Sequence, residues 1–396
     1  MHEWRKCRCD ELILLIFNGG TGMHYRTKAI AVAALALAPL AMMVSLRPAA
    51  AADADVPSKA VKKAKPVADV PFFFVNDNRF TYSYQFTATD PGAFSTRPNG
   101  TIDGHTAKQV YSFTHFDVWA YGTNFINLDL LKSDHNDPAS PCLNVGVSVA
   151  GGPETCAGAA EFYGLIRSTF NWNQLFDTKM FTIGPLQNIS FEIGADGETE
   201  NSFLAPNKKD IVAGLQFQFE LPYKGYVDVA PLYYQEWNHN SFLTPAFVGT
   251  GCITPTGACT GIADGNTRFN PTWAVEINYY MDLGFLPESI QYFAISGRAG
   301  FYGPKGAGAP AAAVQAFNKT ATEINSEPIR LTFDMGKAIW GAKYSHEVDT
   351  WVAYRYWQNK FGLDDSNVNN PVCYTNGVNN HSCTEKSVAA GVTVKF

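Results

Sequence analysis

Aromatic and charged side chains occur together on the same face of several segments whose residues alternate between polar and apolar. The residues that combine the two kinds most clearly are Phe113, His115, Asp117, Glu161, Arg167, Glu236, Arg355 and Trp357. Aromatic faces stack on flat rings, and carboxylates and guanidinium groups form strong hydrogen bonds with polar ligands. This set therefore predicts a binding site for a small polar solute such as a nucleoside or a sugar.

The same side chains also have a purely structural interpretation. Each charged residue is equally well explained as one member of an ion pair that stabilises the fold and does not contact a solute. Three aromatics on these faces, Tyr111, Trp119 and Trp351, also fit the girdles at the two edges of a membrane β-barrel. Both signs of charge occur, so the sequence predicts no strong selection for ions of one sign.

Catalytic motifs are absent from the sequence. There is no G-x-S-x-G, no H-E-x-x-H and no phosphate-binding loop. His115 lies well inside a predicted strand and shares its face with Asp117, but no nucleophile shares that face. The sequence therefore predicts neither an enzyme nor a cofactor. An outer-membrane hydrolase acting through His115 is the enzymatic alternative.

The N-terminal region predicts export of the chain. Arg26 and Lys28 precede the almost wholly apolar run 29–44, and small residues follow at 50–52. This order is typical of a secretory signal peptide; a membrane anchor is disfavoured because the run is short and contains Pro39. The predicted divisions are an extension from a mis-assigned start codon (1–22), the signal peptide (23–52), a flexible periplasmic segment (53–71) and the main domain (72–396).

Six cysteines follow the signal peptide, and they are spaced as three local pairs. Disulfides persist in exported proteins, so three loop disulfides are the simplest of the 15 formal connectivities. The expected pairs are Cys142–Cys156, Cys252–Cys259 and Cys373–Cys383. A metal site is the rival interpretation, but no flanking His or Cys cluster supplies four ligands, and His381 is the nearest candidate.

Composition and charge restrict the class of protein. The 396 residues are 46% hydrophobic and 17% charged, with 28 Phe, 18 Tyr and 8 Trp, which excludes a disordered chain. A net charge of −6 argues against a nucleic-acid-binding protein. Beyond the N-terminal region no apolar run reaches about 18 residues, so the heavy aromatic content indicates a membrane β-barrel rather than a helical membrane protein.

Alternation of period two runs through the main domain. In residues 79–89, for example, Phe80, Tyr82 and Tyr84 share one face, and Thr and Ser residues share the other. Most of these segments have about the ten residues that a tilted strand needs to cross a bilayer. The predicted strands are 79–89, 108–119, 123–132, 160–171, 188–197, 209–220, 225–238, 270–282, 289–302, 330–344, 349–359 and 386–396. Gly336 and Gly341 interrupt the tenth.

The connections between these segments alternate in length. All three cysteine pairs lie in the long ones, and 172–187 is the exception among the short ones. Short turns on one side and long loops on the other are typical of an outer-membrane barrel. The predicted fold is an all-β, transmembrane, antiparallel up-and-down β-barrel of about 12 strands. A soluble lectin-like β-sandwich is the alternative.

Several short phrases of the sequence resemble a known family. They lie within 110–137, 161–172, 214–240, 351–359 and 391–396, and the most specific are LYYQEWN and AYRYW. In this order the chain resembles, over residues 72–396, the Tsx/OmpK family of nucleoside-specific outer-membrane channels. The resemblance implies a narrow, aromatic-lined pore for passive nucleoside uptake. The positions that look like the lumen positions of that family are Phe113, Asp117, Glu161, Arg167, Glu236, Arg355 and Trp357.

These observations predict a passive channel in the outer membrane of a Gram-negative bacterium, with a mixed-charge, aromatic lumen. The expected partners are outer-membrane lipid, a small polar solute such as a nucleoside, and the barrel-assembly machinery, which reads a terminal aromatic such as Phe396. The alternative is a surface-exposed barrel that acts as an adhesin or phage receptor through its disulfide-stapled loops.

Overall fold

The computed structural model describes residues 72–396 except 97–98, 141–156, 203 and 245–263. The predicted signal peptide and N-terminal segments lie outside the described residues. Two predicted disulfides, Cys142–Cys156 and Cys252–Cys259, also lie outside them.

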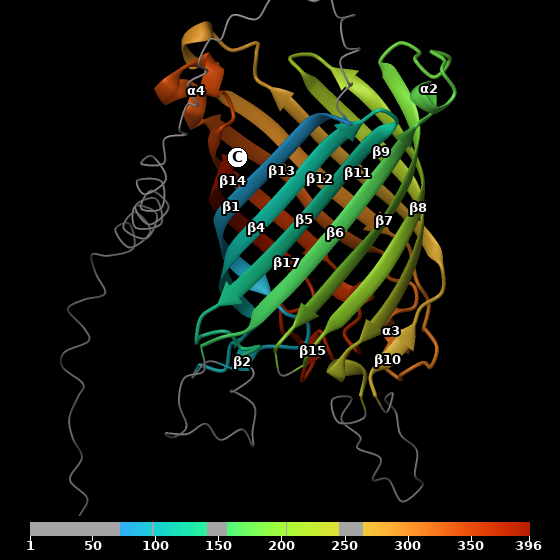
Figure 1. Ribbon diagram of the computed structural model, residues 1–396. Coiled ribbons are helices and arrows are strands. Elements are labelled where there is room, and N and C mark those ends of the chain that lie inside the picture. The colour runs from blue at the N-terminus through green and yellow to red at the C-terminus, as the bar shows by residue number, and fades with distance from the viewer. Residues whose placement is uncertain (1–71, 97–98, 141–156, 203, 245–263) are drawn as a thin grey trace, which may run out of the picture. The chain divides into compact units, whose positions relative to one another are not determined.

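Twelve long antiparallel strands form the sheet, and each pairs with its neighbours along the chain. They are β1 (Phe73–Thr89), β4 (His105–Trp119), β5 (Gly122–Ser133), β6 (Ala160–Asn171), β7 (Leu186–Glu200), β8 (Asn207–Leu221), β9 (Gly225–His239), β11 (Thr272–Asp282), β12 (Phe293–Tyr302), β13 (Glu323–Asp334), β14 (Val348–Gln358) and β17 (Glu385–Lys395). The last strand pairs with the first, from Arg79 opposite Lys395 to Gln85 opposite Ala389, and this closes the barrel. Figure 1 shows the strands running obliquely around it.

Short elements lie in the connections. They are β2 (Ser95–Thr96), β3 (Ile102–Asp103), α2 (Trp172–Leu175), η1 (Ser241–Leu243), β10 (Asn266–Arg268), η2 (Glu288–Ile290), α3 (Gln315–Asn318), α4 (Met335–Trp340), η3 (Ala342–Tyr344), η4 (Lys360–Gly362), β15 (Tyr374–Thr375) and β16 (Val378–Asn379). Among the described residues, no helix has the length and apolar character needed to cross a membrane.

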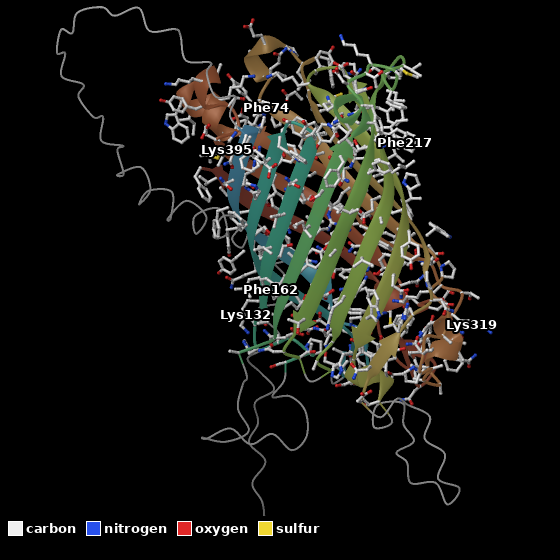
Figure 2. All side chains as sticks on the ribbon, turned by 45° about the vertical axis from the view of Figure 1, so that its right-hand side comes forward. Phe74, Lys132, Phe162, Phe217, Lys319 and Lys395 are labelled. Atoms are coloured by element: carbon white, nitrogen blue, oxygen red, sulfur yellow. A yellow bond between two sulfur atoms is a disulfide. The ribbon has the colours of Figure 1, made fainter. Side chains whose placement is uncertain are left out.

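The two faces of the strands differ in polarity. Outward residues such as Phe191, Ile193 and Trp273 are apolar and about half exposed, and Phe162, labelled in Figure 2, belongs to this set. Inward residues such as Glu192 and Glu236 are polar and buried. An apolar outer surface around a polar interior is the architecture of an outer-membrane β-barrel, because only the outer surface meets lipid. The predicted fold class is confirmed. The predicted location in an outer membrane stays a prediction, which this distribution of polarity favours.

The connections form a short-turn end and a long-loop end. The short-turn end holds 120–121, 172–185, 222–224, 283–292 and 335–347, and the long-loop end holds 90–104, 134–159, 201–206, 240–271, 303–322 and 359–384. In Figure 1, α2 and α4 mark the short-turn end, and β2, β10 and β15 mark the long-loop end. The predicted alternation of connection lengths is therefore observed only in part. Connection 201–206 at the long-loop end is shorter than 172–185, 283–292 and 335–347 at the other end, and the last of these is longer than predicted because the tenth strand ends early.

The predicted tenth strand, 330–344, is wrong. Strand β13 runs from Glu323 to Asp334, and the rest of the predicted segment is helical. The side chain of Asp334 ends the strand because it accepts a hydrogen bond from the backbone N–H of Lys337 at 2.8 Å and so caps α4. Gly341 ends the helix. Its φ is +92°, a backbone conformation that is unfavourable for residues with a Cβ atom.

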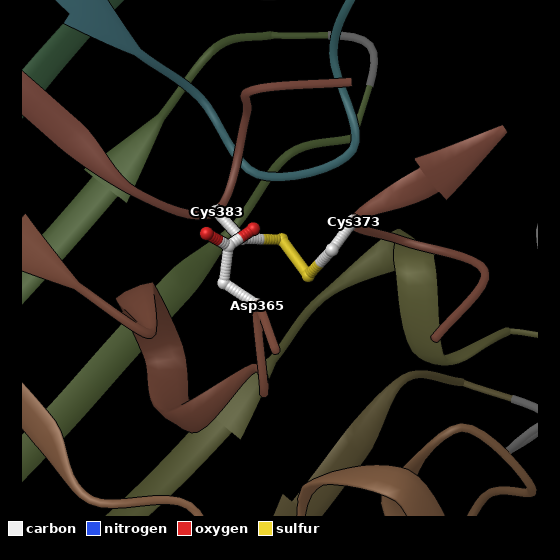
Figure 3. Close-up of side chains that lie close together, drawn as sticks. All are labelled: Asp365, Cys373 and Cys383. Atoms are coloured by element: carbon white, nitrogen blue, oxygen red, sulfur yellow. A yellow bond between two sulfur atoms is a disulfide. The ribbon is translucent and has the colours of Figure 1, made fainter. Parts of the chain in front are cut away.

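Long loops pack on one another at the long-loop end of the barrel. Buried apolar residues from four connections form one cluster: Leu204, Phe242, Leu243, Ala312, Val314, Phe361, Leu363, Val372, Cys373 and Cys383. The predicted disulfide Cys373–Cys383 is present, and Figure 3 shows it beside Asp365. Because disulfide sulfurs are not thiolates, this group of three side chains does not offer a metal its usual sulfur ligands. The loop cluster gives the long-loop end a fixed structure over the barrel interior.

Candidate functional site in the lumen

The register of the strands shows which side chains enter the lumen. Paired residues of neighbouring strands share a face, and the buried Glu192, Glu236 and Glu276 define the inward face. The inward carboxylates are Asp77, Asp129, Glu161, Glu192, Asp196, Glu198, Glu200, Asp210, Asp228, Glu236, Glu276, Asp282, Glu323, Glu327, Asp334, Asp349 and Glu385. The inward cations of the strands are Arg79, Lys108, Arg167, Lys208, Arg298, Arg330, Arg355 and Lys395. Carboxylates therefore outnumber cations along the described lumen wall.

Lys208 is the centre of one buried charge cluster toward the long-loop end. Its Nζ lies 3.3 Å from Glu323, 3.8 Å from Glu236 and 3.9 Å from Asp210. Lys305, from the connection 303–322, forms an ion pair with Glu236. This loop therefore reaches into the lumen. Burial lowers the pKa of Lys305, and the Glu236 charge opposes that shift.

A second cluster surrounds Glu385. Its two carboxylate oxygens lie 3.0 Å from Nε of Arg355 and 2.9 Å from Nζ of Lys360, and Gln85 donates to the first of them. Nζ of Lys360 lies 4.5 Å from the ring centre of Trp357, a cation–π contact. Because Lys360 belongs to the connection 359–384, a second long loop sends a cation into the lumen.

Trp357 joins these two clusters. Its indole N–H donates to Glu323 at 2.8 Å, while its ring contacts Lys360 and Arg355. Only 7% of the residue is exposed. Trp357 is therefore both an aromatic wall of the lumen and a hydrogen-bond donor to a carboxylate inside it.

Lys108 occupies a third cluster, near the same end. Its Nζ lies 2.5 Å from Asp90 and forms an ion pair with Glu161, and Glu200 lies beside these groups. The three carboxylates are close enough together to hold a cation. Because the lysine ammonium already fills that position, the cluster is a closed ion-pair network rather than a vacant metal site.

Arg167 spans the lumen at mid-barrel. From β6 it donates two hydrogen bonds to Glu276 on β11, at 2.7 and 3.0 Å, and a further one to Asp196 at 2.5 Å. Two tyrosines extend this group: Tyr302 donates to Glu276 at 3.2 Å, and Tyr163 donates to Asp196 at 3.1 Å. A bidentate guanidinium–carboxylate pair is rigid and strong, so it fixes the width of the lumen here.

A small cavity lies between these clusters. A cavity of about 20 Å³ is lined by Tyr163, Asp196, Gly197, Glu198, Lys208, Asp210, Tyr302, Asn325 and Trp357. Such a volume holds about one water molecule. Several oxygens that face the interior, including one each of Asp210, Asp228 and Asn325, are buried without a hydrogen-bond partner among the described residues. This cavity, called the constriction below, is therefore lined by aromatic rings and by two of these unpartnered acceptors, those of Asp210 and Asn325.

Comparisons with known proteins find similarity to membrane barrels of solved structure. The COG4313 outer membrane channel from Pseudomonas putida F1 matches with 11% identity and a TM-score of 0.40, over 84% of this chain and 100% of that one. The translocator domain of the autotransporter NalP from Neisseria meningitidis matches with 8% identity and a TM-score of 0.36, over 81% and 89%. OccAB3 of Acinetobacter baumannii matches with 9% identity and a TM-score of 0.30, over 81% and 99%. No protein-family model and no curated protein matches the chain.

Five predicted site residues lie in the lumen. Arg167, Glu236 and Trp357 are less than a tenth exposed, and Glu161 and Arg355 are partly buried. The structure joins Arg355 and Trp357 directly and places Glu236 in the Lys208 cluster, whereas Glu161 and Arg167 belong to separate clusters. Their contact with a solute stays a prediction.

The lumen placement of Phe113, His115 and Asp117 is wrong. Phe113 pairs with Phe80, which is 43% exposed on the outer surface, so all three residues face outward. His115 and Asp117 are polar but hydrogen-bonded to each other at 3.1 Å, and Asp117 accepts from Asn124 at 2.9 Å. Polar side chains can face outward when they form hydrogen bonds with one another. The prediction placed these residues in the lumen because it assumed that charged side chains face inward.

The sequence analysis did not identify several charged residues of the lumen. Lys108, Lys208 and Glu323 lie near strand ends, Glu385 is one residue before the predicted last strand, and Lys305 and Lys360 come from loops. The alternation of Lys208 with Asp210 is a signal that was present in the sequence. No periodic signal marks the loop lysines, because their entry into the lumen depends on how the loops fold.

Proposed function

We propose that this protein is a passive outer-membrane channel for small polar solutes and that nucleosides are the favoured class. The observation that carries the proposal is the constriction, where three aromatic rings (Tyr163, Tyr302 and Trp357) line the same cavity as Asp210 and Asn325. Asp210 and Asn325 each have one side-chain oxygen without a hydrogen-bond partner among the described residues. Aromatic faces suit a flat base, and carboxylate oxygens accept hydrogen bonds from ribose hydroxyl groups. The resemblance to nucleoside channels in the sequence agrees with this choice.

The narrowness of the constriction requires side chains to move during passage. A cavity of about 20 Å³ is far too small for a nucleoside. Lys305 and Lys360 belong to loops rather than strands, so they are the groups that withdraw at least cost to the barrel. We infer that the solute replaces their ion-pair contacts as it passes.

The excess of carboxylates gives the lumen a negative potential. A narrow passage with low-dielectric walls strengthens such a field, so neutral and cationic solutes are favoured over anions of the same size. Neutral nucleosides satisfy this condition, whereas nucleotides do not.

Conductance of the purified protein in planar bilayers tests the proposal. Adenosine or thymidine added at millimolar concentration should reduce the ion current, and Trp357→Ala should weaken that block about tenfold. Trp273→Ala is the matched control, because Trp273 is half exposed on the outer surface, and Phe113→Ala should also leave the block unchanged. An absence of conductance, or equal block in the Trp357 and Trp273 variants, would contradict the proposal.

A further inference from the structure

Three carboxylates border the constriction, and one of them has no direct partner. Asp196 forms an ion pair with Arg167, and one oxygen of Asp210 accepts a hydrogen bond from Tyr234 at 3.3 Å. The carboxylate of Glu198 forms neither an ion pair nor a hydrogen bond with any described residue. Because polar groups inside proteins are normally hydrogen-bonded, Glu198 has unused capacity at the point where a solute must pass.

The strand register explains why Glu198 lies in the lumen. On β7 it is the register partner of Tyr163 on β6 and of Lys208 on β8, both of which face inward. The ammonium group of Lys208 lies beside other carboxylates, of which Glu323 is the nearest at 3.3 Å. The closest cation in the register therefore leaves the oxygens of Glu198 unoccupied.

Positive charges act on Glu198 from three parts of the chain, namely β4, β8 and the region 355–360. The cations are Lys108, Lys208, Arg355 and Lys360. Each of them forms its own ion pair with a different carboxylate. Glu198 therefore lies among the three charge clusters of the long-loop end without belonging to any of them.

A second polar side chain without a partner borders the constriction from another wall. Oδ1 of Asn325 on β13 is buried and accepts no hydrogen bond from the described residues. Asn325 is the register partner of Trp357, and both border the constriction. Strands β8, β9, β11 and β12 lie between β7 and β13 in the sheet, so Asn325 and Glu198 approach the cavity from different sides of the barrel.

The aromatic residues of the constriction have already used their polar groups. The indole N–H of Trp357 donates to Glu323, and the hydroxyl groups of Tyr163 and Tyr302 donate to Asp196 and Glu276. These three residues therefore offer a solute ring surface rather than hydrogen bonds. The hydrogen bonds must come from the polar groups that lack partners.

We propose that Glu198 binds the cis-diol of a ribose ring and Asn325 the edge of the base, so that the channel favours ribonucleosides over 2′-deoxyribonucleosides. This inference rests on the proposed function and names its solute more narrowly. Two adjacent hydroxyl groups can donate to the two oxygens of one carboxylate, and an amide offers a base one donor and one acceptor. A site built to bind a hydroxyl group rejects the analogue that lacks it, because a polar group of the site then stays unpaired.

Block of the ion current by two pairs of compounds tests the proposal: adenosine with 2′-deoxyadenosine, and ribose with 2-deoxyribose. In the wild-type protein the ribo compound of each pair should block at about tenfold lower concentration, which corresponds to one hydrogen bond to a charged group. Glu198→Gln should reduce both ratios to about one. Asn325→Leu should weaken block by adenosine about three- to tenfold and leave block by ribose unchanged, because ribose has no base.

The matched control is Asp228→Asn. Asp228 is also an inward carboxylate, but it does not border the constriction, so its replacement changes the charge of the lumen and should leave both ratios unchanged. Equal block within each pair in the wild-type protein, or unchanged ratios in Glu198→Gln, would overturn the inference. The wild-type ratios do not depend on the folding of a variant.

The ribose pair separates this inference from the proposed function. If neither nucleoside blocks the current but ribose blocks it more strongly than 2-deoxyribose, the nucleoside proposal fails and the role of Glu198 stands. If both nucleosides block equally well, the proposed function stands and the role of Glu198 fails. An absence of block by all four compounds would overturn both.

Discussion

Arg167 and Glu276 join β6 to β11 across the lumen through two hydrogen bonds of 2.7 and 3.0 Å, although β7, β8 and β9 separate the two strands in the sheet. The pair crosses the interior of the barrel and joins two strands that are not neighbours in the sheet. Both residues are less than a tenth exposed, so the pair is desolvated and its loss has consequences for both stability and pore width.

Replacing Arg167 alone should destabilise the barrel. Arg167→Ala leaves Glu276 and Asp196 buried without their cation, and breaking such a pair costs about 3–5 kcal/mol. Arg167→Met combined with Glu276→Leu removes both charges of the pair and leaves only Asp196 without its cation, so it should be less destabilising than Arg167→Ala. Urea unfolding in detergent measures the two free energies, and equal destabilisation by the single and double replacements would contradict a structural role for the pair.

The loop lysines should limit conductance. Lys305 and Lys360 enter the lumen from long loops and pair with Glu236 and Glu385, so Lys305→Ala with Lys360→Ala should raise single-channel conductance about two- to fivefold. Lys319→Ala is the control, because Lys319 lies in the same loop as Lys305 but is exposed (Figure 2). Unchanged conductance in the double variant would place the limiting barrier elsewhere.

The lumen should prefer cations. Reversal potentials under a salt gradient should give a cation-to-anion permeability ratio above one, because carboxylates outnumber cationic groups on the described lumen wall. Asp210→Asn with Asp228→Asn removes two acidic charges and should move the ratio toward one, and high salt should reduce the preference by screening. A wild-type pore that prefers anions would contradict this account of the field.

The disulfide Cys373–Cys383 should stabilise the loop cluster rather than the barrel. A cross-link over a sequence separation of 10 residues restricts the unfolded chain by about 2–3 kcal/mol in the chain-entropy description. Cys373→Ser with Cys383→Ser should therefore make residues 359–384 more sensitive to protease while the strands keep their far-ultraviolet circular dichroism. Loss of the strand signal would show that the loops and the barrel unfold as one unit.

Much of the fold is encoded locally. Alternation of period two, the length of each segment and the unequal connections predicted a twelve-strand barrel because a strand in lipid must place apolar residues outward at every second position. The strand 160–171 agrees with the structure at both ends. The tenth strand does not, because the cap formed by Asp334 competes with strand extension, and a short apolar helix and a strand have similar compositions.

The choice of face is harder to predict where both faces carry apolar residues. In β4 the polar side chains of His115 and Asp117 predicted that the face they share with Phe113 is inward. The pairing of Phe113 with the outward Phe80 shows that this face is outward. A shift of one residue exchanges the two faces of a strand, so parity alone is decisive only where one face is clearly polar. Arg167, Glu236 and Trp357 lie on strands of that kind.

The sequence by itself determined the barrel, its strand order and some of the charges inside it, because these follow from a repeat that each strand carries independently. Only the tertiary structure decided which charges meet, that Lys305 and Lys360 enter from the loops, and that Asp282, Asp334 and His346 share one end of the lumen. The physical reason is that barrel closure and loop packing bring together residues far apart in sequence, and neither leaves a periodic signal in the chain.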